Sequence, residues 1–130
     1  MGHRVIQWTT GNVGERSLKA IIANPHLELV GVYAHGPTKV GRDAADLCGW
    51  PEPTGVTATS DVDALLALRP DVCVYNPRWP DVDELVRLLE AGVNVVTTAA
   101  FIDGRAMGPA AQARIRSAAE QGGASIHGTG

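Results

Sequence analysis

The sequence has little of what marks out the more specialised classes of protein. Its 130 residues include two cysteines and one phenylalanine and carry a net charge of −3, so neither a disulfide scaffold nor a nucleic-acid partner is indicated. The longest apolar runs fall far short of the ~20 residues that a transmembrane helix needs. The amino terminus turns polar too early for a signal peptide. We therefore expect an ordinary globular protein of the cytoplasm, with no membrane partner.

The two cysteines, Cys48 and Cys73, lack the close spacing of metal-binding or redox pairs. Cys73 lies inside the apolar run "DVCVYN", so a buried thiol is a better interpretation than a reactive one. The chain also holds no Ser/His/Asp or His/Cys/Glu set at a spacing that suggests a catalytic or metal site. We expect no bound metal.

What is present is a regular alternation of short β-prone runs and amphipathic segments. Strands are expected at 4–8, 27–34, 56–59, 71–76, 94–99 and 124–128. Helices are expected at 12–23, 60–68, 80–92 and 109–122, the second capped by Ser60 and the third beginning at Pro80. The stretch 35–55, rich in proline and glycine, is expected to be irregular.

Strands that alternate with helical crossovers predict a parallel sheet with helices on both faces and right-handed connections. A chain of this length forms one domain with a sizeable core. The sequence therefore predicts an α/β protein, a doubly wound parallel sheet of the Rossmann-like, dinucleotide-binding kind, over residues 1–130.

The segment "TTGNVG" lies between the first expected strand and helix, where a G-x-G-x-x-G turn would hold a pyrophosphate. Thr9 takes the place of the first glycine, while Gly11 and Gly14 keep the second and third. We expect Thr9 to be tolerated there if its φ stays negative. The hydroxyls of Thr9 and Thr10, the free N–H groups of residues 12–15 and the helix dipole would then bind phosphate. A purely structural turn that needs small residues is the alternative.

The segment after the second expected strand bears on the choice of cofactor. NAD-specific domains place an Asp or Glu there to bind the ribose 2′-hydroxyl, but no carboxylate occurs here before Asp43. Three potential cations and a hydroxyl are found instead: His35, Thr38, Lys39 and Arg42. Such groups favour a 2′-phosphate, so NADP is the expected cofactor, with NAD possible. A loop in which these cations are simply solvated is the alternative.

Four stretches carry a resemblance to a known family: "WTTGNVGERSLKAII", "KVGRDAADLCG", "VYNPRWPDVDELVRLLEAGVNVVTTAAF" and the terminal "HGTG". Together they resemble the dihydrodipicolinate-reductase-like oxidoreductases, in the branch of 2,4-diaminopentanoate dehydrogenase and the native amine dehydrogenases. The resemblance covers essentially the whole chain. Family members are much longer and carry a second, β-rich domain that closes the substrate pocket and makes the dimer contacts. The resemblance thus implies the nucleotide-binding half of a homodimeric enzyme.

The resemblance implies reversible hydride transfer between NAD(P)H and an amine or imine carbon, with a keto compound as a further possible substrate. It places three groups of residues around the cofactor. The pyrophosphate would be lined by Gly11, Asn12, Val13 and Gly14. The nicotinamide ribose would be flanked by Asn76, Pro77 and Arg78, and the nicotinamide by Thr97, Thr98 and Ala99. All follow expected strands, at the edge where an open α/β sheet has its ligand crevice.

One departure from the family concerns the chemistry. The amine dehydrogenases orient the amine with a glutamate after the fifth strand, whereas "FIDGRAMGP" contains Asp103 as its only carboxylate. Asp103 is a candidate for a shorter catalytic substitute, although "DG" is also a common turn pair. A stand-alone NAD(P)-binding or CoA-binding module without turnover is the alternative to an enzyme.

Overall fold

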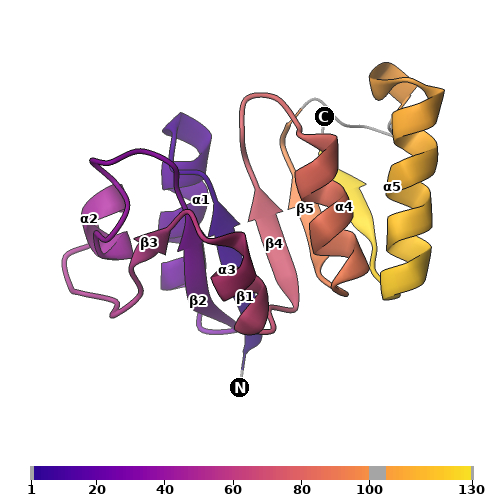
Figure 1. The fold of residues 1–130 in the computed structure, drawn as a ribbon. Coiled ribbons are helices and arrows are strands. Elements are labelled where there is room, and N and C mark those ends of the chain that lie inside the picture. Colours follow the sequence, from indigo (N-terminus) through magenta and orange to yellow (C-terminus); the bar gives the residue numbers. More distant parts are fainter. Residues whose placement is uncertain (1, 100–104, 130) are drawn as a thin grey trace.

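The computed structural model describes residues 2–99 and 105–129, in which one sheet lies between two layers of helices (Figure 1). The strands of this part of the chain are β1 (His3–Trp8), β2 (Leu27–Tyr33), β3 (Ala58–Thr59), β4 (Val72–Tyr75), β5 (Asn94–Thr97) and β6 (Ile126–Gly128). Its helices are α1 (Asn12–Ala23), α2 (Ala44–Cys48), α3 (Val62–Ala67), α4 (Val82–Glu90), α5 (Pro109–Gly122) and the short 3-10 turn η1 (Arg105–Met107).

The six strands of the described residues form one sheet in the order β3-β2-β1-β4-β5-β6, and every pair of neighbours is parallel. Trp8 pairs with Tyr33 on one side and with Tyr75 on the other, so β1, β2 and β4 end level with one another. The chain order reverses between β1 and β4, which makes their carboxyl ends the place for a ligand crevice. The expected doubly wound, Rossmann-like fold is confirmed.

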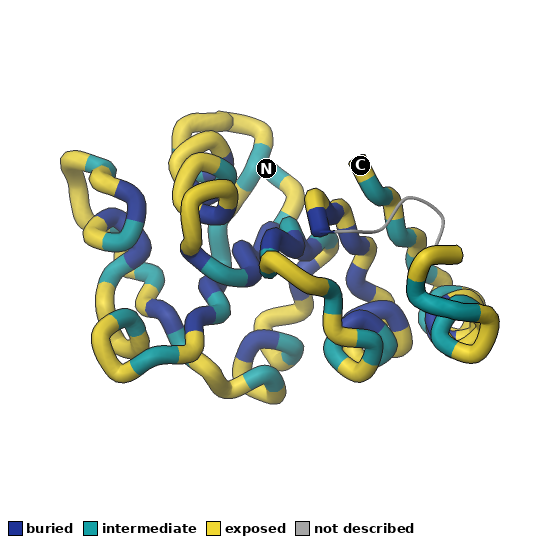
Figure 2. The backbone as a smooth tube through the Cα atoms, turned by 90° about the horizontal axis from the view of Figure 1, so that it is seen from above, coloured by how far each residue is buried: buried dark blue, intermediate teal, exposed yellow. Residues whose placement is uncertain are grey.

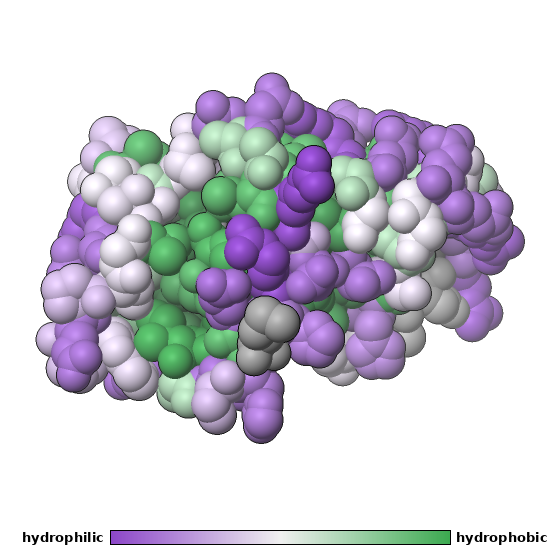
Figure 3. All heavy atoms as spheres, turned by 90° about the horizontal axis from the view of Figure 1, so that it is seen from below, coloured by the Kyte–Doolittle hydropathy of each residue, from purple (hydrophilic) through white to green (hydrophobic). Residues whose placement is uncertain are grey.

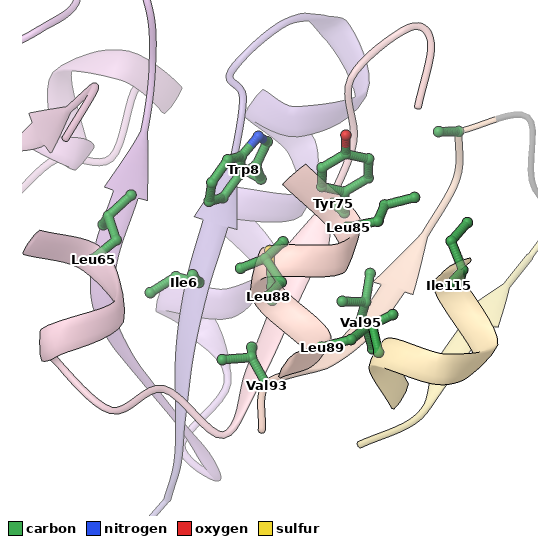
Figure 4. Packing of buried hydrophobic residues seen from close by; sticks show 13 residues of the cluster. Ile6, Trp8, Leu65, Tyr75, Leu85, Leu88, Leu89, Val93, Val95 and Ile115 are labelled. Atoms are coloured by element: carbon green, nitrogen blue, oxygen red, sulfur yellow. The ribbon is translucent and has the colours of Figure 1, made fainter. Parts of the chain in front are cut away.

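Each face of the sheet has its own apolar core. On one face, α1 and α2 pack on β2 and β3 through Leu18, Val32, Ala44 and Cys48. On the other face a larger cluster joins the sheet to α3, α4 and α5, as Figure 4 shows for its labelled residues. Buried positions follow the sheet and the inner sides of the helices (Figure 2). The free thiol of Cys73 is fully buried, as expected.

The amino ends of the strands are held together by Arg4. Its backbone N–H donates to Asp71 Oδ2 at 2.8 Å, and its guanidinium donates to the carbonyl oxygen of Leu68 at 2.8 Å and lies 3.4 Å from the carboxylate of Glu28. Figure 3, which views the molecule from this end, shows strongly hydrophilic side chains near the centre with apolar ones beside them. Arg4 thereby fixes β1 against the chain that enters β4.

Three expectations about helices were wrong, each because of an aspartate. The stretch 35–55 contains α2, whose amino end is capped by Asp43 through a 2.8 Å bond from the Ala45 N–H. Asp61, not Ser60, caps α3, since its Oδ1 accepts from Ala64 at 3.1 Å. Asp81 caps α4 in the same way, so Pro80 lies before the helix. A carboxylate accepts these N–H bonds more strongly than a hydroxyl does.

Candidate functional site

A crevice lies over the carboxyl ends of β1, β2 and β4, formed by two adjoining hollows of about 270 and 490 Å³. The first is lined by Thr9, Thr10, Gly11, Ala34, His35, Lys39, Asn76, Pro77 and Arg78. The second is lined by Gly11, Asn12, Val13, Asn76, Pro77, Arg78 and Thr98. The two share Gly11 and the residues 76–78, so they lie directly beside each other. It brings together most of the site residues expected from the sequence.

The two glycines of the turn differ in what surrounds them. Gly11 is the N-cap of α1, and a Cβ atom added to it would meet nothing within 4 Å. A Cβ atom on Gly14 would collide with the backbone carbonyl of Thr9. Gly14 therefore permits the close packing of helix on strand that the third glycine of the fingerprint provides. At Gly11 the fold itself does not require glycine, and the open space belongs to the crevice.

Thr9 does not have the expected backbone conformation. Its φ is +73°, in the left-handed region that a first glycine would adopt without strain, so the expectation of a negative φ was wrong. The conformation is held on both sides. The Thr9 N–H donates to the Tyr33 carbonyl at 2.9 Å, and the Thr9 carbonyl accepts from Nε2 of Gln7 at 3.0 Å. The role of Gln7 could not be predicted from the sequence, where it is simply a polar residue in an expected strand.

Several polar atoms at the start of this turn are buried without a partner among the described residues. They include the hydroxyl oxygens of Thr9 and Thr10, and Thr10 as a whole is only 6% exposed. Buried hydroxyls are almost always hydrogen-bonded, to protein, water or ligand. Since both threonines line the crevice, the unused hydroxyls fit an oxygen-rich ligand such as a phosphate.

The amino end of α1 supplies further donors beside the same space. The backbone N–H groups of Asn12, Val13 and Gly14 precede Glu15, the first residue whose N–H donates within this helix. Glu15, which we had included among the free donors, already donates its N–H to the Gly11 carbonyl at 2.8 Å. The amino end of α1 thus offers one free donor fewer than expected, and its positive dipole end faces the crevice, which Gly11, Asn12 and Val13 line.

The loops after β4 and β5 are tied to the turn by side-chain amides. Asn76 accepts from Gln7 Nε2 at 2.8 Å through its Oδ1 and donates from Nδ2 to Thr98 Oγ1 at 2.9 Å. Asn76 is 8% exposed, yet it lines both hollows. Asn76, the first of the residues expected to flank the nicotinamide ribose, is therefore held by contacts with β1 and with the loop after β5.

Tyr75 fixes the other end of the loop after β4. Its fully buried hydroxyl donates to Glu84 Oε1 at 2.8 Å and accepts from the backbone N–H of Asp81 at 2.9 Å. Burial above all, together with the neighbouring carboxylates of Glu84 and Asp81, raises the pKa of Tyr75 well above its ordinary value. The phenol stays protonated and keeps the loop that carries Pro77 and Arg78 against α4.

The cations after β2 differ in their relation to the crevice. Lys39 lines it and donates from Nζ to the Thr10 carbonyl at 3.3 Å, which holds the ammonium group beside the turn. His35 lines it as well, with its ring 6.0 Å from that of Tyr33. Arg42 is exposed and is not among the lining residues of either hollow. The structure thus separates Lys39 from Arg42, which the sequence had grouped together.

The residues expected beside the nicotinamide, at the end of β5 and after it, differ in whether they line the crevice. Thr98 lines the crevice, whereas Thr97 and Ala99 are buried and bonded to each other, the Ala99 N–H donating to Thr97 Oγ1 at 2.9 Å.

Asp103 lies outside the described residues. Within the described part of the chain, no group of three or more His, Cys, Asp or Glu residues could hold a metal ion. None of the helices described there is long and apolar enough to cross a bilayer.

Comparison with proteins of known function finds oxidoreductases that are similar in sequence to this chain. An amine dehydrogenase of Streptomyces virginiae is 36% identical over 132 residues, which cover 96% of this chain and 37% of that protein. A 4-hydroxy-tetrahydrodipicolinate reductase of Trichormus variabilis is 32% identical over 62 residues, 48% of this chain and 22% of that protein. No family model matches the chain. The chain thus spans little more than a third of the length of the first relative.

Solved structures show the same relationship. The structure of an amine dehydrogenase from Mycobacterium smegmatis superposes with a TM-score of 0.83 at 26% identity, over 98% of this chain and 39% of that one. GenD2 from gentamicin A biosynthesis, solved in complex with NAD, gives a TM-score of 0.72 at 18% identity, over 98% of this chain and 34% of that one. This second likeness concerns the fold alone.

The fold and crevice define a Rossmann-like domain of the kind found in NAD-binding dehydrogenases. The chain is similar to an amine dehydrogenase over little more than a third of that protein's length, and about half of it is similar to part of a 4-hydroxy-tetrahydrodipicolinate reductase. The resemblance seen in the sequence is confirmed over that stretch.

Proposed function

We propose that the chain binds a nicotinamide dinucleotide in the crevice and forms the cofactor-binding part of an oxidoreductase. The observation that carries this proposal is the turn 9–14. It combines buried hydroxyls without a partner, the amino end of a helix and open space at Gly11, all at the point where the strand order reverses. These features fit a pyrophosphate, which is anionic and needs close approach to the backbone.

The crevice offers a distinct place to each part of such a cofactor. Gly11, Asn12 and Val13 would hold the pyrophosphate through backbone N–H groups, with the Thr10 hydroxyl beside them. The adenosine ribose would lie toward His35 and Lys39, and the nicotinamide ribose toward the loop 76–78. Thr98, which is bonded to Asn76, would lie closest to the nicotinamide. When bound, the cofactor supplies the hydride.

For the substrate we propose an amine, imine or keto compound, because an amine dehydrogenase is 36% identical to this chain over 96% of its residues. We propose that the whole enzyme is a cytoplasmic homodimer, in which residues outside those described complete the substrate pocket. Asp103 remains our candidate for the group that orients the substrate amine. The chain's own described residues would position the cofactor and hold its phosphates.

We further propose that NADP is preferred to NAD. The segment that follows β2 has no carboxylate near the crevice, while the Lys39 ammonium lies beside the turn and His35 lines the same hollow. A 2′-phosphate would gain a charge-assisted bond from Lys39. Arg42 would contribute only if its side chain turned toward the crevice.

Titration calorimetry of the protein with NADPH, NADH and coenzyme A tests the proposal. We expect saturable binding of the nicotinamide nucleotides, with NADPH bound more tightly, and no binding of coenzyme A. Binding of coenzyme A without any response to the nicotinamides would contradict the proposed function. NADH bound tenfold more tightly than NADPH would contradict the cofactor preference alone.

A further inference from the structure

The backbone of Thr9 is strained, and the strain lies inside the proposed pyrophosphate turn. Its φ of +73° is a rare conformation for a β-branched residue. Residues held in such regions persist only where the surrounding structure enforces them. Thr9 is also close-packed, because its carbonyl lies against Gly14 and leaves no room for a Cβ atom there. Some neighbouring group must therefore hold this peptide in place.

Gln7 is placed to do so. It lies in β1, and its side chain is completely buried. Its Nε2 donates toward three oxygen atoms, the Thr9 carbonyl at 3.0 Å, the Trp8 carbonyl at 3.4 Å and Asn76 Oδ1 at 2.8 Å, while its Oε1 is buried without a partner among the described residues. An amide oxygen in the place of Nε2 would face these acceptors without a hydrogen between them, so the orientation of the amide follows from its surroundings.

The same amide connects three of the loops that line the crevice, two of them directly and the third through Asn76. Gln7 bonds to Thr9 in the loop after β1 and to Asn76 in the loop after β4. Asn76 in turn donates to Thr98 after β5. The chain of contacts Gln7–Asn76–Thr98 thus connects a strained turn with the two loops on the opposite side of the crevice.

We propose that Gln7 is a positioning residue for the nucleotide site. Its amide holds Thr9 in the left-handed conformation and orients Asn76, so that the turn and the loops 76–78 and 98–99 have their binding arrangement before a ligand arrives. That the ligand is a nicotinamide dinucleotide rests on the proposed function. The support of Thr9 by Gln7 does not depend on any ligand. Gln7 takes no part in the chemistry.

A double-mutant cycle separates this role from simple packing. Gln7→Met keeps the length and volume of the side chain but removes the donor, while Thr9→Gly removes the need for support because glycine adopts positive φ without strain. We expect Gln7→Met to weaken NADPH binding about tenfold, the usual scale for a lost buried hydrogen bond. In the Thr9→Gly background the same change should weaken binding much less.

Two further measurements accompany the affinities. Urea unfolding of the four proteins should show the same coupling, with Gln7→Met costing less when residue 9 is glycine. NMR couplings should report a positive φ for Thr9 in the wild type and a negative one in Gln7→Met. Gln121→Met is the matched control, because Gln121 is exposed on α5 and the same change there should alter neither quantity.

Each outcome decides the proposal. Equal effects of Gln7→Met in the two backgrounds, or a Thr9 φ that stays positive without the amide, would overturn it. If Gln7→Met alone does not fold, folding of the double variant supports the proposal, and failure of both contradicts it. If the wild type binds no nicotinamide nucleotide, the proposed function fails, while the unfolding cycle still decides whether Gln7 supports Thr9.

Discussion

The carbonyl oxygen of Thr9 lies so close to Gly14 that a Cβ atom on this glycine would collide with it. This relationship sets how closely α1 approaches β1 and therefore where its amino end meets the crevice. The left-handed backbone of Thr9 is what turns that carbonyl toward the helix side of the turn, where the Gln7 amide also meets it. Strand, turn and helix form one tightly packed unit.

We expect Gly14→Ala to destabilise the protein by about 1–3 kcal/mol, the usual cost of forcing an atom into a close-packed site against backbone. The loss is to be measured by urea denaturation. Gly11→Ala is the matched control, because a Cβ atom at that position meets open space, and its effect on the free energy of unfolding should be clearly smaller. Equal losses in the two variants would show that the contact with Thr9 is not what limits residue 14.

Gly11→Val should leave the stability of the fold largely intact but weaken the binding of NADPH. The added side chain has room within the protein, so folding should be retained, but it would occupy the space through which a pyrophosphate approaches the backbone. We expect the affinity for NADPH, measured by calorimetry, to fall more than tenfold. Unchanged affinity in a folded Gly11→Val variant would remove the turn from the proposed binding site.

Lys39→Ala should separate the two nicotinamide cofactors. Only NADPH carries the 2′-phosphate that the Lys39 ammonium would bind, so its affinity should fall by about 1–3 kcal/mol while that of NADH changes little. Arg42→Ala serves as the control, because Arg42 does not line the crevice, and it should have a smaller effect on either cofactor. A parallel loss for both cofactors would assign Lys39 a role in holding the turn instead.

Asp43 makes the protein's stability depend on pH in the acid range. The backbone N–H of Ala45 above all, with further bonds from Thr54 and Gly55, lowers the pKa of the Asp43 carboxyl from 3.8 to about 2. Because the pKa is lower in the folded state, the ionised carboxylate stabilises the fold above pH ~4. That contribution is lost as the pH falls from about 4 toward 2.

We expect urea unfolding of the wild type to show a loss of stability over this interval that is smaller in Asp43→Asn. Asp46→Asn, an exposed change on the same helix α2, is the control and should keep the wild-type pH dependence. An identical acid profile for Asp43→Asn and the wild type would contradict the assignment.

The sequence predicted the fold well, because glycine, proline and apolar spacing act locally. The turn 9–14 and the helix from Pro109 to Gly122 were located from such signals. The helix α2 was missed although Asp43 and the left-handed Gly49 bound it, since the surrounding prolines suggested irregular chain. The φ of Thr9 could not be predicted, because the group that stabilises it, Gln7, acts through tertiary contacts with Asn76.

The pairing of β1 with β4 has a consequence for how the protein is made. Gln7 and Asn76 are 69 positions apart, and the pairing of β1 with β4 joins segments that are separated to a similar extent. When β1, α1 and β2 have left the ribosome, the turn 9–14 is therefore present without the loop 76–78 that lines the same crevice. The loop closure entropy of this long connection must be overcome before β1 pairs with β4, so we expect the crevice to form late in folding. Nascent chains that stop short of β4 should fold locally around α1 and β2 yet be unable to retain nucleotide.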